Sequence, residues 1–228
     1  MTTLLLIRHG RTAANTGGVL AGWTPGVGLD DVGREQVRAL AERLRPVPLA
    51  AVVASPLDRC QQTAAGIAEN RDGLAVATDE RFGEVRYGSW TGRTLKELTR
   101  EPVWKVVQAH PSAAVFPDGE GLAAVQARAV AAVRAWNASL GPDAIYAACT
   151  HADVAKSILA DALGLHLDLF QRIVVDPCSV SVVTYTDTRP FVVRVNDTGG
   201  DVRALIPPKR RRRKRRPADA AVGGGAGR

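Results

Sequence analysis

The stretch Leu4-Leu5-Leu6-Ile7-Arg8-His9-Gly10 joins four consecutive apolar residues to an arginine, a histidine and a glycine. Such a run is typical of a buried strand that ends at a sharp turn. Side chains at the carboxyl end of a strand point into the crevice where open α/β sheets bind ligands. Arg8 and His9 are costly to bury without partners, so either a ligand or the local loops must satisfy them.

Strand-like and helix-like segments alternate along the rest of the chain. Apolar spacing predicts helices over residues 31–44, 57–69, 94–110, 122–139 and 153–163, the first of them capped by Asp30 or Asp31. Apolar or β-branched runs predict strands over residues 2–7, 49–54, 74–78 and 144–150, with a late hairpin over 179–186 and 190–195. This alternation predicts an α/β fold with a mostly parallel central sheet.

The charge distribution separates a near-neutral body from a basic tail. The net charge is +7, but the run KRRRRKRR at residues 209–216 carries eight positive charges, and without them the net charge becomes −1. From Ile206 the composition turns to Pro, Arg and Lys and then to Ala and Gly. We therefore predict one domain over residues 1–205 and a disordered tail over 206–228. The isoelectric point of about 9.8 describes the tail and does not mark the body as a nucleic-acid-binding protein.

The basic run leaves two interpretations open. Eight consecutive basic residues can bind a polyanion weakly, such as nucleic acid, polyphosphate or an anionic membrane surface. Against a binding role, arginine outnumbers lysine 25 to 5 in the chain, as GC-rich coding would produce, and no aromatic residues alternate with the charges.

The cysteines and the hydropathy pattern indicate the compartment. Cys60, Cys149 and Cys178 are odd in number and lack metal-ligand spacing, which favours buried free thiols in a reducing compartment. No signal peptide precedes the first predicted strand, and no apolar run approaches the roughly 20 residues that a membrane span needs. We expect a soluble, cytoplasmic protein.

Unusual polar residues follow three of the predicted strands. Arg8 and His9 close the first strand, Arg59 lies in the first turn of the helix after the second, and His151 follows the strand over 144–150. Because the carboxyl ends of parallel strands share one edge of a sheet, these four side chains can converge. Two guanidinium groups around two imidazoles would bind a tetrahedral dianion, since guanidinium binds phosphate in bidentate fashion.

These residues resemble the histidine phosphatase superfamily, which has the phosphoglycerate mutase-like fold. The resemblance covers roughly residues 2–185 and implies a three-layer sandwich, with helices flanking the sheet. Its blocks, in chain order, are Arg8-His9-Gly10-Arg11-Thr12 with Asn15; Ser55-Pro56-Leu57 with Arg59, Gln62 and Thr63; Glu84 with Tyr87-Gly88-Ser89-Trp90 and Gly92; and Thr150-His151. A weaker block is Leu29-Asp30-Asp31-Val32-Gly33 with Gln36.

The resemblance implies a role for each matched residue. His9 would be the nucleophile that accepts the phosphoryl group, and Glu84 would protonate the leaving oxygen and then activate water. The residues that would bind the phosphate oxygens are Arg8, Asn15, Arg59 and His151. No metal and no cofactor is implied, because the arginines supply the positive charge, and the His, Asp and Glu spacings contain no metal-ligand set.

Elementary electrostatics agrees with these roles. An imidazole attacks only when it is neutral, and the arginines beside His9 disfavour its protonated form. Fixed positive donors stabilise the charge that spreads over the oxygens of a transferring phosphoryl group. Glu84 must carry a proton to act as an acid, so we predict that burial beside bound phosphate raises its pKa.

Some residues depart from the family pattern or lie outside it. His151-Ala152-Asp153 stands where the family usually has His-Gly-Gly, and we expect Asp153 to cap the following helix. His110 and His166 match nothing in the family and are predicted to be surface or loop residues. Trp90 is predicted to be a packing residue.

The sequence favours a phosphatase acting on a small phosphorylated metabolite. The alternative is a cofactor-dependent phosphoglycerate mutase or another phosphomutase. Such mutases carry a long basic insertion where this chain has only residues 98–121, with Arg100 and Lys105. A non-catalytic binding protein is a third class, which the complete set of matched catalytic residues argues against. Folds of this kind are often homodimers.

Overall fold

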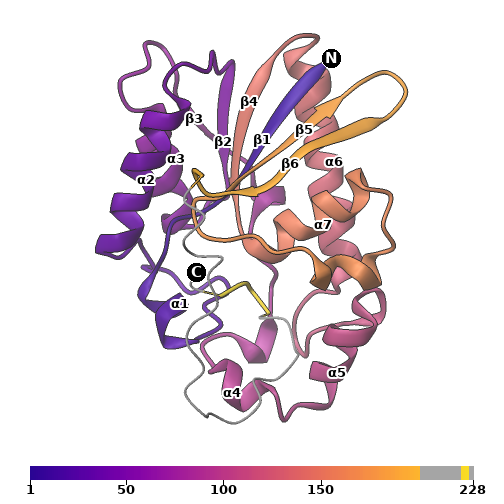
Figure 1. Ribbon diagram of the computed structural model, residues 1–228. Coiled ribbons are helices and arrows are strands. Elements are labelled where there is room, and N and C mark those ends of the chain that lie inside the picture. Colours follow the sequence, from indigo (N-terminus) through magenta and orange to yellow (C-terminus); the bar gives the residue numbers. More distant parts are fainter. Residues whose placement is uncertain (201–221, 226–228) are drawn as a thin grey trace.

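The structure is a computed structural model that describes residues 1–200 and 222–225. Six strands form one sheet in the order β3-β2-β4-β1-β5-β6 (Figure 1). The strands are β1 (Thr2–Arg8), β2 (Ala51–Ala54), β3 (Val76–Thr78), β4 (Ile145–Thr150), β5 (Val180–Tyr185) and β6 (Pro190–Asp197). The helices are α1 (Ala13–Gly17), α2 (Asp31–Leu44), α3 (Asp58–Ala68), α4 (Leu95–Leu98), α5 (Pro102–Ala109), α6 (Leu122–Leu140) and α7 (Ala152–Ala162). Short 3₁₀ helices cover Glu80–Phe82, Gly88–Trp90, Pro111–Ala113 and Leu167–Arg172.

Strands β1 to β4 are parallel, and β5 and β6 add an antiparallel edge. In the parallel register Arg8 lies opposite Thr150, and Ala54 lies opposite Cys149. The residues that follow β1, β2 and β4 therefore leave the sheet at the same edge. This arrangement confirms the predicted α/β fold, its mostly parallel sheet and the late hairpin.

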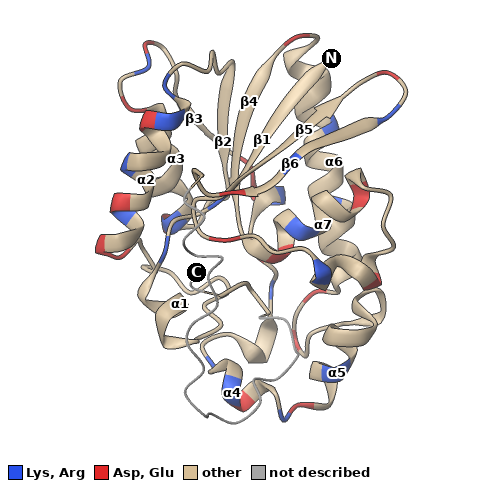
Figure 2. Ribbon diagram, in the orientation of Figure 1, with Lys and Arg blue, Asp and Glu red and all other residues tan. Residues whose placement is uncertain are grey.

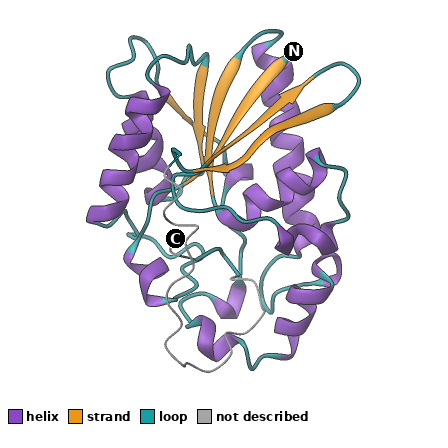
Figure 3. Cartoon of the chain, in the orientation of Figure 1, coloured by secondary structure: helices purple, strands orange, loops and turns teal. Residues whose placement is uncertain are grey.

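Alternate side chains of the sheet face two different helix layers. Leu4 and Leu6 of β1 point into a core shared with α6 and α7. Leu5 and Ile7 point into a second core shared with α2 and α3. Helices accordingly cover both faces of the sheet (Figure 3), and charged residues gather on helices and loops, away from the central strands (Figure 2). Because both faces are buried, β1 is a continuous apolar run rather than an alternating one.

The helix predicted over residues 94–110 is in fact two helices. Thr94 caps α4 in a capping box with Glu97, and Pro102 begins α5. Proline lacks an N–H and clashes inside a helix but is well placed at its first position, so the helix is interrupted there. Helix α1 was not predicted, because five residues are too short for a periodic pattern. The other predicted elements are present with ends within about two residues.

The start of α2 holds the loop that follows β1. Of the two predicted caps, Asp30 is the one that caps the helix, accepting from the Gly33 N–H at 2.7 Å. Asp30 Oδ2 also pairs with Arg11 Nε at 2.8 Å, and Gln36 Oε1 accepts from the Arg11 N–H at 3.0 Å. A Cβ atom on Gly33 would lie 2.1 Å from the Arg11 carbonyl oxygen. Residues 29–36, the weaker block of the resemblance, therefore fix the loop that follows His9.

Replacing Gly33 by alanine should lower the free energy of unfolding by about 1–3 kcal/mol, because the added methyl group must displace the Arg11 backbone. The matched control is Gly17→Ala, whose Cβ would approach no atom closer than 3.8 Å. Denaturant unfolding of both variants measures the difference. Equal stabilities of the two variants would contradict the close contact between α2 and the loop.

Three further predictions from the sequence can be compared with the structure. In residues 1–200 and 222–225, no helix is long and apolar enough to cross a membrane. Cys60, Cys149 and Cys178 are free and buried, as expected. The basic run 209–216 lies outside the described residues, so the domain boundary and the nature of the tail stay predictions. Residues 222–225 are described, and Val222 is 1% exposed.

Candidate active site

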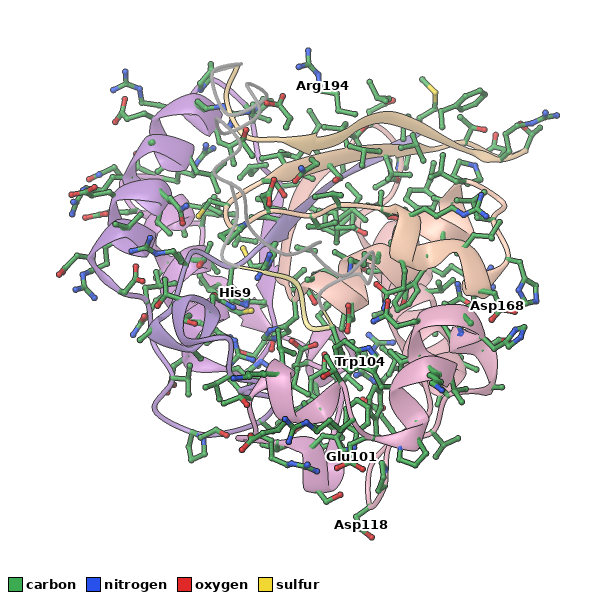
Figure 4. The ribbon with its side chains drawn as sticks, turned by 60° about the horizontal axis from the view of Figure 1, so that its bottom comes forward. His9, Glu101, Trp104, Asp118, Asp168 and Arg194 are labelled. Atoms are coloured by element: carbon green, nitrogen blue, oxygen red, sulfur yellow. The ribbon has the colours of Figure 1, made fainter. Side chains whose placement is uncertain are left out.

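The candidate residues lie at the edge of the sheet where the parallel strands end. Arg8 ends β1 and His9 follows it, His151 follows β4, and Arg59 is the second residue of α3. Glu84 lies in the loop after the 3₁₀ helix Glu80–Phe82. Each of the five residues is at most 4% exposed. Figure 4 shows His9 inside the molecule, beyond the lower edge of the sheet.

His9 is held as a neutral imidazole, and its Nε2 has no hydrogen-bond partner among the described residues. Its Nδ1 donates to the Gly10 carbonyl oxygen at 2.7 Å, and a carbonyl can only accept, so Nε2 carries the lone pair. Burial, together with the positive charges of Arg59 and Arg8, holds the pKa of His9 well below its usual range. The Gly10 N–H donates to Thr63 Oγ1 at 3.0 Å and fixes the turn. Nε2 of His9 is therefore available as a nucleophile.

Both arginines keep an unpaired donor in the interior. Arg8 donates from Nη1 to the Val175 carbonyl oxygen at 2.8 Å and from Nη2 to that of Gly225 at 2.6 Å. Arg59 donates from Nη2 to the Gly22 carbonyl oxygen at 2.8 Å. Arg8 Nε and Arg59 Nη1 are buried and have no hydrogen-bond partner among the described residues. Leaving such donors unpaired costs free energy, and both nitrogens could donate hydrogen bonds to an anionic ligand.

The side chain of Glu84 is suited to hold and release a proton near neutral pH. Burial, followed by the negative charge of Asp153, raises its pKa to about 7. Arg59 and a hydrogen bond from the Val85 N–H to Oε1 at 3.0 Å oppose that rise. The other carboxylate oxygen lies 3.6 Å from His151 Nδ1. The raised pKa agrees with the expectation from the sequence.

His151 is buried next to His9 and Glu84. Its ring centroid is 5.2 Å from that of His9, and its Nε2 hydrogen-bonds with Ser55 Oγ at 2.8 Å. Burial, Arg59 and the other nearby positive groups hold its pKa well below the usual range. Ser55 thus orients His151, a role that the sequence analysis did not assign to it.

One pocket joins most of the candidates. His9, Asn15, Arg59 and Glu84 line it together with Thr12. Asn15 Oδ1 accepts from the Thr12 N–H and Oγ1, each at 3.0 Å, and so completes the capping box at the start of α1. The amide nitrogen of Asn15 is therefore the atom that could donate to a ligand. Arg8 and His151 do not line this pocket but adjoin it through the contacts given above.

The family model described as the histidine phosphatase superfamily (branch 1) matches residues 4–198. This chain belongs to the histidine phosphatase superfamily. Phosphoserine phosphatase 1 of Hydrogenobacter thermophilus is 28% identical over 206 residues, which cover 87% of this chain and 93% of that protein. A protein named probable phosphoglycerate mutase GpmB, from Yersinia enterocolitica, is 29% identical over 212 residues, which cover 91% and 97%. The solved structure of Bacillus stearothermophilus YhfR has a TM-score of 0.81 and 28% identity, over 86% of this chain and 98% of that one.

These findings confirm the resemblance seen in the sequence. The family and its phosphatase members also confirm that this histidine phosphatase is an enzyme of the phosphatase type.

One expectation about the site of this histidine phosphatase is wrong. Asp153 does not cap α7, because His151 occupies the N-cap position. Instead Asp153 Oδ2 accepts from the Tyr87 hydroxyl at 3.0 Å, and Oδ1 accepts from Lys156 Nζ at 3.3 Å. The three-residue spacing of Asp153 and Lys156 on a helix was a signal for the ion pair. The bond to Tyr87 had no such local signal.

Other predictions about side chains hold. His110 and His166 are exposed, with 74% and 69% of their side-chain surface accessible. Trp90 is 1% exposed and stacks on Trp104 with ring centroids 6.2 Å apart, so it is a packing residue.

Two other kinds of site are relevant among the described residues, a metal-binding cluster and a larger groove. Among the residues that the structure describes, no group of three or more His, Cys, Asp or Glu side chains could hold a metal ion. A groove of about 960 Å³ lies between α2 and α3, but none of the six candidate residues lines it.

Proposed function

We propose that this enzyme hydrolyses phosphomonoesters of small metabolites through a phosphohistidine on Nε2 of His9. The observation that carries the proposal is the pair of buried, unpaired guanidinium nitrogens, Arg8 Nε and Arg59 Nη1, beside a neutral imidazole. Donors fixed in this way would stabilise the charge on the phosphoryl oxygens as it develops. Burial lowers the pKa of Arg8 only to about 10, so its positive charge persists at neutral pH.

The proposed reaction has two balanced steps. In the first, the Nε2 lone pair of His9 attacks phosphorus, the bond to the leaving oxygen breaks, and the carboxyl proton of Glu84 moves to that oxygen. In the second, the Glu84 carboxylate takes a proton from water, the water oxygen attacks phosphorus, and the N–P bond breaks to release orthophosphate. A carboxyl group with a pKa of about 7 suits both steps, because each protonation state is well populated at neutral pH.

Arg8, Arg59, His151 and Asn15 bind the phosphoryl oxygens in this proposal. The arginines supply the positive charge that a metal would otherwise provide, so we expect the reaction to be independent of metal ions. Ser55 acts on substrate only through His151.

Hydrolysis fits the pocket better than a mutase reaction does. A mutase must bind a second phosphate group of a bisphosphorylated intermediate. Among the described residues that line the pocket, Arg59 is the one cation. Arg100 and Lys105 of the short segment after α4 do not line it. The relatives carry both kinds of name, and the one named phosphoserine phosphatase supports a small phosphorylated metabolite as the substrate class.

The test is phosphate release from a panel of sugar phosphates, phosphoglycerates, phosphoamino acids and nucleotides, with and without a metal chelator. We expect at least one small metabolite to be hydrolysed at a rate that the chelator leaves unchanged. Background from contaminating phosphatases is measured with a His9→Ala preparation made in parallel. Isomerisation of 3-phosphoglycerate that requires 2,3-bisphosphoglycerate would overturn the choice of a phosphatase.

A homodimer, a cytoplasmic location and weak polyanion binding by residues 209–216 complete the proposal. They rest on the sequence alone.

A further inference from the structure

The four described residues of the C-terminal segment, 222–225, lie at the pocket of the candidate active site. Val222, Gly223 and Gly224 line the pocket together with His9 and Arg59. Val222 is 1% exposed and belongs to the hydrophobic core next to α6 and α7. In Figures 1 and 4 this short yellow segment crosses the space beyond the carboxyl ends of the strands, close to His9 in Figure 4.

Two charged site residues hold the backbone of the segment. The Gly225 carbonyl oxygen accepts from Arg8 Nη2 at 2.6 Å. The Gly223 N–H donates to Asp153 Oδ2 at 2.8 Å. Hydrogen bonds to ionised groups are stronger than those between neutral groups. The segment therefore engages the same Arg8 guanidinium that the proposed function assigns to phosphate.

The segment can approach Ala152 and Arg8 this closely only because residue 224 is a glycine. Gly224 has φ +71°, and a Cβ atom there would lie 2.4 Å from Ala152 Cβ and 2.8 Å from Arg8 Nη1. Positive φ is a conformation that other residues rarely adopt. In the sequence Val222-Gly223-Gly224-Gly225, one apolar side chain anchors the segment, and the three glycines have no side chains that would prevent it from entering the site.

The occupied pocket has almost no room for a substrate. The cavity that remains is about 20 Å³, which suffices for about one water molecule. We propose that residues 222–225 are an autoinhibitory plug, which occupies the phosphate pocket and competes with substrate for it. This inference rests on the proposed function, because it takes the pocket to be the phosphate site.

The chain has enough length for the plug to leave without disturbing the sheet. Residues 201–221 separate it in the sequence from Gly200, and a chain of that length can span at most about 70 Å. Tethering gives such a segment an effective concentration in the millimolar range, so even a weak contact competes with substrate. Because the competition is for one site, the plug raises the apparent KM and leaves kcat unchanged.

Gly224→Ala in the full chain is the sharpest test, since one methyl group prevents the segment from entering. We expect the KM for a hydrolysed phosphomonoester to fall about tenfold with kcat unchanged. The matched control is Gly225→Ala, whose Cβ would meet nothing within 4 Å and whose carbonyl oxygen is retained. This variant should have the KM of the unaltered protein. Val222→Asp, which removes the apolar anchor, should lower KM as Gly224→Ala does.

Calorimetric binding of orthophosphate provides a second readout that needs no turnover. We expect Gly224→Ala to bind orthophosphate about tenfold more tightly than the unaltered protein and Gly225→Ala. Equal binding by all three proteins, with equal KM values, would overturn the plug and leave the proposed function intact. A higher KM in Gly224→Ala would also overturn it, since the segment would then be part of the substrate site. If none of the proteins binds orthophosphate, the proposed function fails and the plug fails with it.

Discussion

Replacing His9 by alanine should abolish phosphate release, with kcat falling by at least about 10³-fold. Alanine has no nucleophilic atom to replace Nε2 of His9, which keeps its lone pair because Nδ1 is the nitrogen that donates to Gly10. Binding of the phosphoryl group by the arginines is retained in this variant, so orthophosphate or substrate should still bind. The loss is therefore expected in kcat rather than in affinity.

The covalent intermediate gives the second readout for the same variant. After rapid quenching, the unaltered enzyme should carry radiolabel from a labelled phosphomonoester, in a linkage that is labile in acid and stable in base, as an N–P bond is. His9→Ala should carry none. The matched control is His110→Ala, in which the exposed His110, 74% accessible in its side chain, is removed and activity should not change. Retained turnover in His9→Ala, or label on another residue, would refute His9 as the nucleophile.

Glu84→Gln should lower kcat for an alkyl phosphate by about 10²- to 10⁴-fold. The amide keeps the size of the carboxyl group but can neither give a proton to the leaving oxygen nor take one from water. With p-nitrophenyl phosphate, whose leaving group needs no proton, formation of the phosphoenzyme should be slowed far less. Burst kinetics on the two substrates separate the first step from the second.

The pH profile follows from the raised pKa of Glu84. Because that pKa is about 7, the carboxyl group is protonated below pH 7 and ionised above it. Only the protonated form can act as the acid, so kcat/KM for an alkyl phosphate should fall as the pH rises through about 7. Glu84→Gln should lose this limb of the profile. Glu80→Gln, the same change at an exposed glutamate four residues earlier, is the control. An unchanged profile in Glu84→Gln would contradict the assignment of Glu84 as the acid.

Sequence alone determined those features of the protein that depend on neighbouring residues. The apolar run of β1 ends at Arg8-His9, and that of β4 ends before His151, so both strands and the polar residues after them are visible locally. Alternation of strands with helices implied a parallel sheet, and a parallel sheet brings its carboxyl ends to one edge. The placement of Arg8, His9, Arg59 and His151 near each other followed from that geometry.

Only the tertiary structure decided which atoms meet and with what effect. Asp153 bonds to Tyr87 across 66 positions and to Gly223 across 70, and Arg8 bonds to Gly225 across 217. No local pattern encodes such distant pairs, so the sequence misassigned Asp153 to a helix cap and gave no sign of the contact between Arg8 and Gly225. The pKa of Glu84 is likewise set by burial and distant charges. Hydrophobic periodicity extends over a few residues, whereas the environment of a buried charge is assembled by the whole fold.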